Sequence, residues 1–197
     1  MEKNIFTSDD RITLRPLTEE NKDDYFLLLQ QTSSAPEDYT DKATQDFMWE
    51  LLKKIENLNY SVFDENDEYC GNLVIQDHLS ATPEIGIDLL INKRCKGIAA
   101  RAIRLYAKKA YNKNTIDHYL IKALEANTHS RRMIEKTGAV FSHIEERISK
   151  KMLRSCLGIY DDFKSDYIKE KLKQRISEME SIPDDVYVYK LMPEAFI

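Results

Sequence analysis

The sequence of 197 residues predicts a mixed α/β fold in which helices cover one sheet of about seven strands. Segments with the spacing of strands or helices follow one another in the order strand–helix–helix–strand–strand–strand–helix–strand–helix–strand–strand. A buried strand near the middle of the chain runs almost directly into a helix, and the first strand, residues 11–16, alternates polar and apolar residues. The length itself predicts one domain, at ~150 residues per domain.

The first half of the chain predicts one strand, two helices and a hairpin. Thr18 precedes a helical pattern as an N-cap residue does, and a second helix is expected over 44–56. An acidic turn at 64–67 separates two short strands, which is typical of a hairpin. The strands predicted here are residues 11–16, 60–63 and 69–75.

The second half predicts four strands, two further helices and a helical insert. The helices are expected at 97–111 and 127–137, the second ended by Gly138. Apolar residues spaced mostly three to five apart predict one long helix or two over about 150–180. The predicted strands of this half are residues 84–91, 118–124, 139–145 and 185–192.

Composition excludes several classes of protein. The N-terminus has no apolar signal region, and no stretch approaches the ~18 apolar residues of a membrane span. Cys70, Cys95 and Cys156 are isolated and odd in number, which favours free thiols and a cytoplasmic location. The four histidines lack metal-ligand spacing, so no metal site is expected. A pI near 5.5 argues against nucleic acid as a partner.

The net charge of −5 is distributed unevenly. Residues 32–68 contain ten acids and three bases, a local charge of −7. Residues 89–116 contain eight bases and no acid. One side of the molecule is therefore expected to meet an anion, and another side to meet a cation.

The junction between the central strand and its helix has the features of an anion site. Successive backbone N–H groups at a helix start bind anions, and the helix dipole favours negative charge there. Gly97 allows close approach of a phosphate, and Ala99 is small. The segment has no Gly-Lys-Ser/Thr and only one glycine, which excludes a Walker A loop and a GxGxxG loop.

This junction resembles a known family. Arg94-x-x-Gly97-x-Ala99 resembles the acyl-CoA pyrophosphate loop, Arg/Gln-x-x-Gly-x-Gly/Ala, of the GNAT superfamily of N-acetyltransferases. Asn127-Thr-His-Ser130 with Lys136-Thr-Gly-Ala139 is similar to the next conserved segment of that family. The first and last strands are also similar. The resemblance covers roughly residues 11–146 and 184–195, and it leans toward the ribosomal-protein and polyamine acetyltransferase branches.

The resemblance implies a GNAT fold in a single domain, 1–197, with an unusually long insert at about 150–180. It implies acetyl-CoA as cosubstrate, with Glu84 as the catalytic base. Asp88 lies on the same strand face by the alternation of side chains, but Glu84 is preferred as the base. The family often has a tyrosine as general acid where this chain has Ile134, so Ser130 or water is expected to protonate the thiolate. The cofactor-binding residues that the resemblance implies are Leu89, Leu90, Ile91, Arg94, Cys95, Lys96, Gly97, Ile98, Ala99, Ala100, Asn127 and Ser130.

The expected activity is acetyl transfer to a primary amine of a cationic acceptor, such as a polyamine, an aminoglycoside or a peptide N-terminus. The acidic stretch 32–68 is the basis for the cationic acceptor. The insert is expected to cover the acceptor side or to form a homodimer contact. Two alternatives stay open: a non-catalytic acyl-CoA-binding regulatory module on the same fold, and a nucleotide-binding α/β domain.

Overall fold

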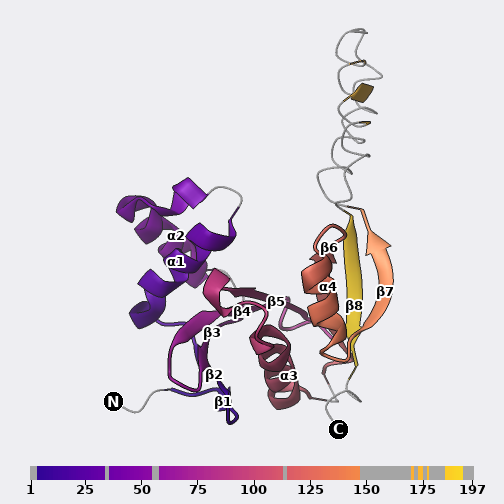
Figure 1. Cartoon of the computed structure of the whole chain (residues 1–197), viewed down its shortest axis with the longest axis horizontal. Helices are drawn as coiled ribbons and strands as arrows, with labels where there is room; N and C mark the ends of the chain where they lie inside the picture. The colour runs from indigo at the N-terminus through magenta and orange to yellow at the C-terminus, as the bar shows by residue number, and fades with distance from the viewer. Residues whose placement is uncertain are drawn as a thin grey trace.

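The computed structural model describes residues 4–33, 36–54, 58–112, 115–146 and 185–192, together with residues 170, 173, 174 and 177. Within them lies an eight-stranded sheet with the strand order β1-β2-β3-β4-β5-β6-β8-β7 (Figure 1). Every neighbouring pair is antiparallel except β5 and β6. The strands are β1 (Thr7–Ser8), β2 (Ile12–Pro16), β3 (Leu58–Asp64), β4 (Tyr69–Gln76), β5 (Glu84–Leu89), β6 (Tyr119–Leu124), β7 (Val140–Glu145) and β8 (Val186–Leu191).

The predicted fold class and all seven predicted strands are confirmed; β1 is the additional strand. Two strand boundaries differ by two residues from the prediction: β3 begins at Leu58 rather than at 60, and β5 ends at Leu89 rather than at 91. The chain turns there into a short 3-10 helix, η3, and the Ile91 amide donates to the side-chain oxygen Oε1 of Gln31 at 2.9 Å.

The helices also lie where the spacing predicts them. They are α1 (Lys22–Thr32), α2 (Lys42–Lys54), α3 (Ile98–Ala110) and α4 (Thr128–Glu135), with the 3-10 helices η1 (Glu19–Asn21), η2 (Pro36–Tyr39) and η3 (Ile91–Lys93). Thr18 was wrongly predicted to cap α1 with its side chain. It precedes η1 instead and makes no cap bond.

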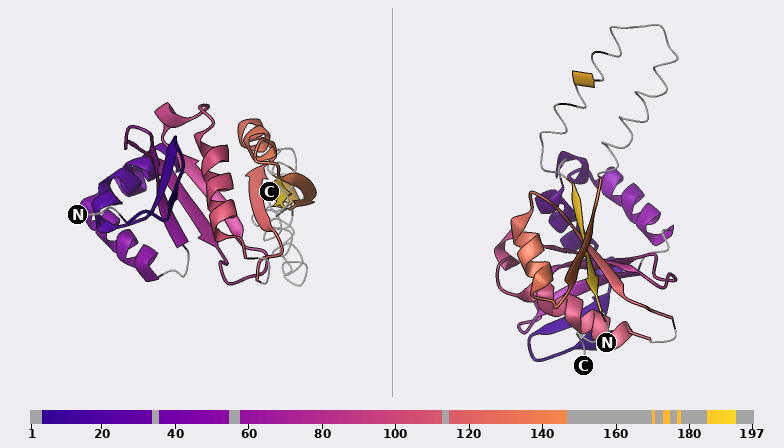
Figure 2. Two further views of the ribbon diagram at one scale, coloured as in Figure 1. Left: turned by 90° about the horizontal axis from the view of Figure 1, so that it is seen from below. Right: turned by 90° about the vertical axis from the view of Figure 1, so that its right-hand side faces the viewer.

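Helices cover both faces of the sheet (Figures 1 and 2). On one face, α3 buries Ala102 and Ile103 against a large core that includes Ile85 and Leu89 of β5. On the other face, α1 contributes Leu28 to a second cluster, which it forms with residues of β3, β4 and the end of β5. Because side chains alternate along a strand, Glu84 and Asp88 belong to the face opposite α3.

The sheet divides between β5 and β6. Glu84 and Leu120 are the only registered pair along the full described length of these two strands. By contrast, β5 pairs with β4 over six positions, and β6 pairs with β8 over six. The two strands therefore open away from each other beyond Glu84, and the open edges carry backbone groups that neither strand satisfies.

The predicted insert at about 150–180 falls outside the described residues, apart from 170, 173, 174 and 177. Over the part of the chain that is described, no helix is both long and apolar enough to cross a bilayer.

Candidate active site

The start of α3 presents unoccupied backbone amides beside the open end of β5. Gly97 has a left-handed conformation with φ of 80°, and no side chain caps the helix. The first helical hydrogen bond runs from the Arg101 amide to the Gly97 carbonyl, so the amides of Ile98, Ala99 and Ala100 have no partner within the helix. A Cβ built on Gly97 would meet no atom within 4 Å. This arrangement suits an anion.

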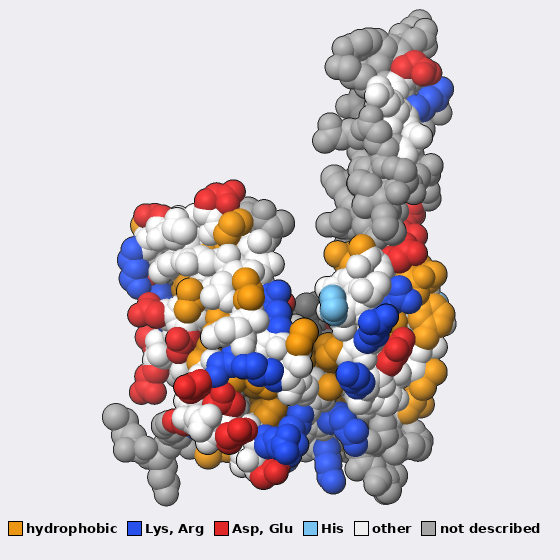
Figure 3. All heavy atoms as spheres, in the orientation of Figure 1, with side chains coloured by type: hydrophobic (Ala, Val, Ile, Leu, Met, Phe, Trp, Pro, Cys, Tyr) orange, Lys and Arg blue, Asp and Glu red, His pale blue; other side chains and the backbone are white. Residues whose placement is uncertain are grey.

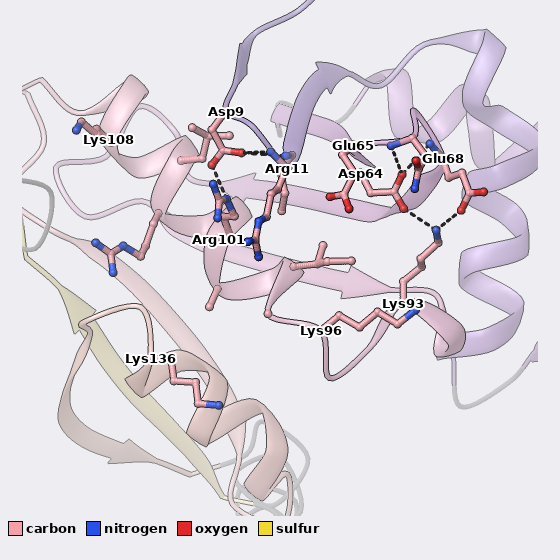
Figure 4. Close-up of a pocket in the computed structure, with 17 residues that line it drawn as sticks. Asp9, Arg11, Asp64, Glu65, Glu68, Lys93, Lys96, Arg101, Lys108 and Lys136 are labelled. Atoms are coloured by element: carbon pink, nitrogen blue, oxygen red, sulfur yellow. Dashed lines mark hydrogen bonds and ion pairs between the residues drawn. The ribbon is translucent and has the colours of Figure 1, made fainter.

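A cavity of about 890 Å³ opens at this helix start (Figure 4). Gly97, Ile98 and Ala100 line it, whereas Arg94 and Cys95 do not. Five lining bases have no carboxylate partner among the described residues: Arg11, Lys96, Arg104, Lys108 and Lys136. Lys136 reaches the cavity from the end of α4, on the opposite side from the others (Figure 4). The space-filling view shows Lys and Arg side chains around the hollow (Figure 3).

Two other bases of the run 89–116 are engaged by carboxylates. Arg101 donates from Nε to Asp9 Oδ2 at 2.6 Å and also pairs with Asp10. The buried Lys93 bonds Asp64 at 2.7 Å and Glu68, and these two bonds raise the pKa of its ammonium. The basic run therefore consists of structural ion pairs as well as unpaired bases that face the cavity.

The amides expected to pair with the pantetheine arm differ in their availability. The Leu90 amide donates to the Cys70 carbonyl at 2.9 Å and the Ile91 amide to Gln31, so both are engaged. The backbone N–H of Leu90 points toward β4. Because successive N–H groups of a strand point to opposite edges, the N–H of Leu89 points toward the open edge. The Arg94 guanidinium folds back onto the Leu89 carbonyl, at 3.0 Å from Nε.

Glu84 lies at the closed end of the split. Its Oε2 is 3.1 Å from Nζ of Lys122 on β6, and the same ammonium lies 3.1 Å from Oε2 of Glu145. These two carboxylates raise the pKa of Lys122 against the opposing effect of burial, which is the largest single influence on it. A second cavity, of about 450 Å³, opens beside Glu84 and is lined also by His78.

Asp88 occupies a different environment on the same face of β5. Burial by the surrounding protein raises the pKa of its carboxyl above the ordinary value, although Arg94 opposes the shift. Its side chain stays accessible to solvent. No ion pair with a described residue holds it, in contrast to Glu84.

Asn127 and Ser130 stand together at the start of α4. Oδ1 of Asn127 accepts a hydrogen bond from the Ser130 amide at 3.0 Å, which is N-capping geometry. The Ser130 hydroxyl has no hydrogen-bond partner among the described residues. Ile134 is 1% exposed within the main core, so a side chain at that position points into the core.

The acidic stretch 32–68 does not form one continuous wall. Asp46 bonds Lys22 at 2.6 Å, and Glu50 bonds Lys53 at 2.6 Å, both on the α1–α2 side. Asp64 and Glu68 lie on the α3 side, where they hold Lys93. Many of these charges are therefore neutralised locally.

Tertiary structure adds residues that the sequence pattern did not indicate. Asp9 and Arg11 of the N-terminal turn line the larger cavity, and His78 lines the smaller one. No local motif marks them: Asp9 and Arg11 are far in sequence from α3, and His78 belongs to the connection between β4 and β5. Among the described residues, no group of histidine, cysteine and acidic side chains is arranged to hold a metal ion.

The family model described as the acetyltransferase (GNAT) domain matches residues 11–140. The chain belongs to the GNAT acetyltransferase family. No curated protein matches the sequence.

Solved structures share the fold at low sequence identity. A microcin self-immunity acetyltransferase, solved with acetyl-CoA and AMP, is 16% identical with a TM-score of 0.65, over 98% of this chain and 97% of its own. Spermidine N-acetyltransferase from Vibrio cholerae, solved with CoA and spermine, is 13% identical with a TM-score of 0.65, over 95% and 99%. A GNAT-family acetyltransferase from Bacillus anthracis is 16% identical with a TM-score of 0.63, over 95% and 98%.

Proposed function

We propose that this GNAT acetyltransferase transfers the acetyl group of acetyl-CoA to a primary amine of a cationic acceptor. The observation that carries the proposal is the split between β5 and β6, which opens in front of the uncapped start of α3. Two structural neighbours were solved with acetyl-CoA or CoA, and one of them with spermine.

The described residues fit a CoA molecule. The amides of Ile98 to Ala100 would bind its diphosphate, since they have no partner within the helix and Gly97, Ile98 and Ala100 line the cavity. Lys96, Arg104, Lys108 and Lys136 line the adjoining cavity and would neutralise its remaining phosphate charge. The Leu89 amide, at the open edge of β5, would meet the pantetheine arm or the thioester oxygen.

Acetyl transfer requires the amine to attack in its neutral form. In the proposed mechanism Glu84 accepts a proton from the acceptor ammonium, directly or through water. The amine nitrogen then bonds to the thioester carbon, the carbon–sulfur bond breaks, and the sulfur leaves with the electron pair. The nitrogen loses its second proton to solvent water as the amide forms. A free thiol has a pKa of about 8.5, so the thiolate leaves readily and takes up a proton from water, directly or through the Ser130 hydroxyl, which water reprotonates.

The first test compares two glutamates that share one lysine. Glu84→Gln should lower kcat at least ~30-fold, with the KM for acetyl-CoA changed less than threefold, because the base is lost and the cofactor contacts remain. Glu145→Gln is the matched control, since it removes the other carboxylate on Lys122. The measurement is thiol release from acetyl-CoA with a panel of primary amines.

Three outcomes contradict parts of the proposal. Equal loss of kcat in both variants would assign the effect to Lys122 rather than to a base at Glu84. An unchanged kcat in Glu84→Gln would place the base elsewhere. Absence of thiol release with every amine, while CoA still raises the melting temperature, would identify a binding module instead of an enzyme.

A further inference from the structure

A polar cluster lies on the face of β5 opposite α3, where α1 packs against the sheet. Register places Asn72 of β4 directly across from Asp88. Tyr69 of β4 packs with Leu28 of α1 and Leu90, on the α1 side of the sheet. We refer to four residues as the β5 acidic cluster: Asp24, Tyr69, Asn72 and Asp88.

Two members of this cluster are buried and lack hydrogen-bond partners. Tyr69 is 9% exposed and Asn72 is 6% exposed. The Tyr69 hydroxyl and the Asn72 oxygen Oδ1 are both inaccessible to solvent and bond no atom. The Asn72 amide nitrogen is already used, because it donates to Oδ1 of Asn59 at 3.1 Å. Buried polar atoms are nearly always satisfied in proteins, so a polar partner is missing at these two atoms.

The charges around these atoms have one sign. The negative charges of Asp24 and Asp88 contribute to the raised pKa of the Tyr69 phenol, whose main cause is burial. Burial also raises the pKa of Asp24, as it does that of Asp88. Neither carboxylate is held in an ion pair with a described residue. Tyr25, half-buried beside them, has its own pKa raised by burial and by Asp88.

The cluster has more hydrogen-bond acceptors than donors. Its two carboxylates and the Asn72 oxygen Oδ1 only accept, the Tyr69 hydroxyl can both accept and donate, and an alkylammonium group offers three donors and no acceptor. The ring of Tyr25 adds an aromatic surface of the kind that cations favour. An anion or a second carboxylate would meet repulsion here, and a neutral amide would leave the charges of Asp24 and Asp88 uncompensated.

We infer that the β5 acidic cluster is the subsite that binds an alkylammonium group of the acceptor. This inference rests on the proposed acetyltransferase function and assigns its acceptor specificity to Asp24 and Asp88, both outside the acidic stretch 32–68. The cluster binds the cation, while proton removal is a separate step at Glu84. Asp88 and Glu84 are four residues apart on one strand face, which separates their Cα atoms by roughly 13 Å. A polyamine is long enough to span much of that distance.

The test measures steady-state kinetics with spermidine as the probe. Asp88→Asn should raise the KM for spermidine at least ~10-fold and leave kcat and the KM for acetyl-CoA within about threefold. Asp24→Asn should raise the same KM about fivefold. Asp23→Asn is the matched control on α1, because its side chain is 91% exposed and points away from a buried environment. It should leave the KM for spermidine unchanged.

Tyr69→Phe gives a readout that a purely structural role would not produce. The variant removes a hydroxyl with no partner, so the melting temperature of the free protein should stay the same or rise. The KM for spermidine should nevertheless increase about threefold. A lower melting temperature with an unchanged KM would show that the hydroxyl serves the fold alone and would remove it from the subsite.

Calorimetry separates failure of the subsite from failure of the proposed function. If the wild-type protein binds spermidine and Asp88→Asn binds it at least ~10-fold more weakly, the subsite stands even where no thiol is released. The inference would be overturned if Asp88→Asn bound spermidine as tightly as the wild type, or if Asp23→Asn weakened spermidine binding as much as Asp88→Asn does. It would also be overturned if the wild-type protein bound none of spermidine, cadaverine and lysine methyl ester.

Discussion

The helices α3 and α4 each follow a strand along the chain, yet the backbone amides of their first turns are satisfied differently. At α3 the N-cap position is Gly97, which has no side chain, and the first amides face a cavity. At α4 the N-cap is Asn127, whose Oδ1 already accepts from the Ser130 amide. Where a side chain of the helix accepts hydrogen bonds from the first-turn amides, the cap is mainly structural. Where these amides have no acceptor, they can bind an anion.

The largest expected effect comes from a side chain that occupies the free backbone amides at the start of α3. Gly97→Asp places a carboxylate among the amides of α3, and aspartate tolerates the left-handed conformation found there. We expect the KM for acetyl-CoA to rise about 100-fold, or roughly 2.8 kcal/mol. Isothermal titration with CoA would measure the same loss directly.

Gly97→Asn is the matched control for this change, because it has nearly the same size without the charge. We expect it to weaken CoA binding about tenfold less than aspartate does. If both variants bound CoA as the wild type does, the start of α3 would not be the diphosphate site.

The unpaired bases beside α3 should have a smaller effect. Replacing Arg104 and Lys108 together by glutamine should weaken CoA binding about tenfold, because both line the cavity without a carboxylate partner. Dephospho-CoA, which lacks the 3′-phosphate, should be affected much less. Arg101→Gln is the contrasting variant, since Arg101 is occupied by Asp9 and Asp10. An equal loss of affinity in Arg101→Gln would show that only net charge matters.

The smallest expected effect concerns the capped helix. Asn127→Ala removes the cap of α4 and should lower stability by about 1 kcal/mol, or about 2–4 °C in melting temperature. Asn127→Asp keeps a capping oxygen and removes the amide donor, which no described residue uses. We expect it to retain the melting temperature and to raise the KM for acetyl-CoA about fivefold. No change in that KM would limit Asn127 to a structural role.

Local pattern was sufficient for the elements and for the uncapped helix start at α3. The strand before Arg94, the glycine and the following amphipathic helix are contiguous in sequence, so their spacing alone predicted a helix start that can bind phosphate. The position of Ile134 was also marked as a departure from the family, and the structure places its side chain in the core.

Charge runs were a poorer guide, because sequence does not show which charges meet. Lys93 and Arg101 belong to the basic run, but tertiary contacts engage them with Asp64 and Asp9. Asp46 belongs to the acidic run, and Lys22 neutralises it. The two carboxylates of the β5 acidic cluster, Asp24 and Asp88, lie outside that run.

The sequence by itself determined the order of strands and helices, the family and the loop that opens α3, because those properties depend on residues close together along the chain. Only the tertiary structure decided the opening between β5 and β6, the Glu84–Lys122 ion pair and the buried acceptors of Tyr69 and Asn72. Each of these depends on which strand lies beside which, and burial in a packed interior determines whether a polar group keeps water or needs a partner.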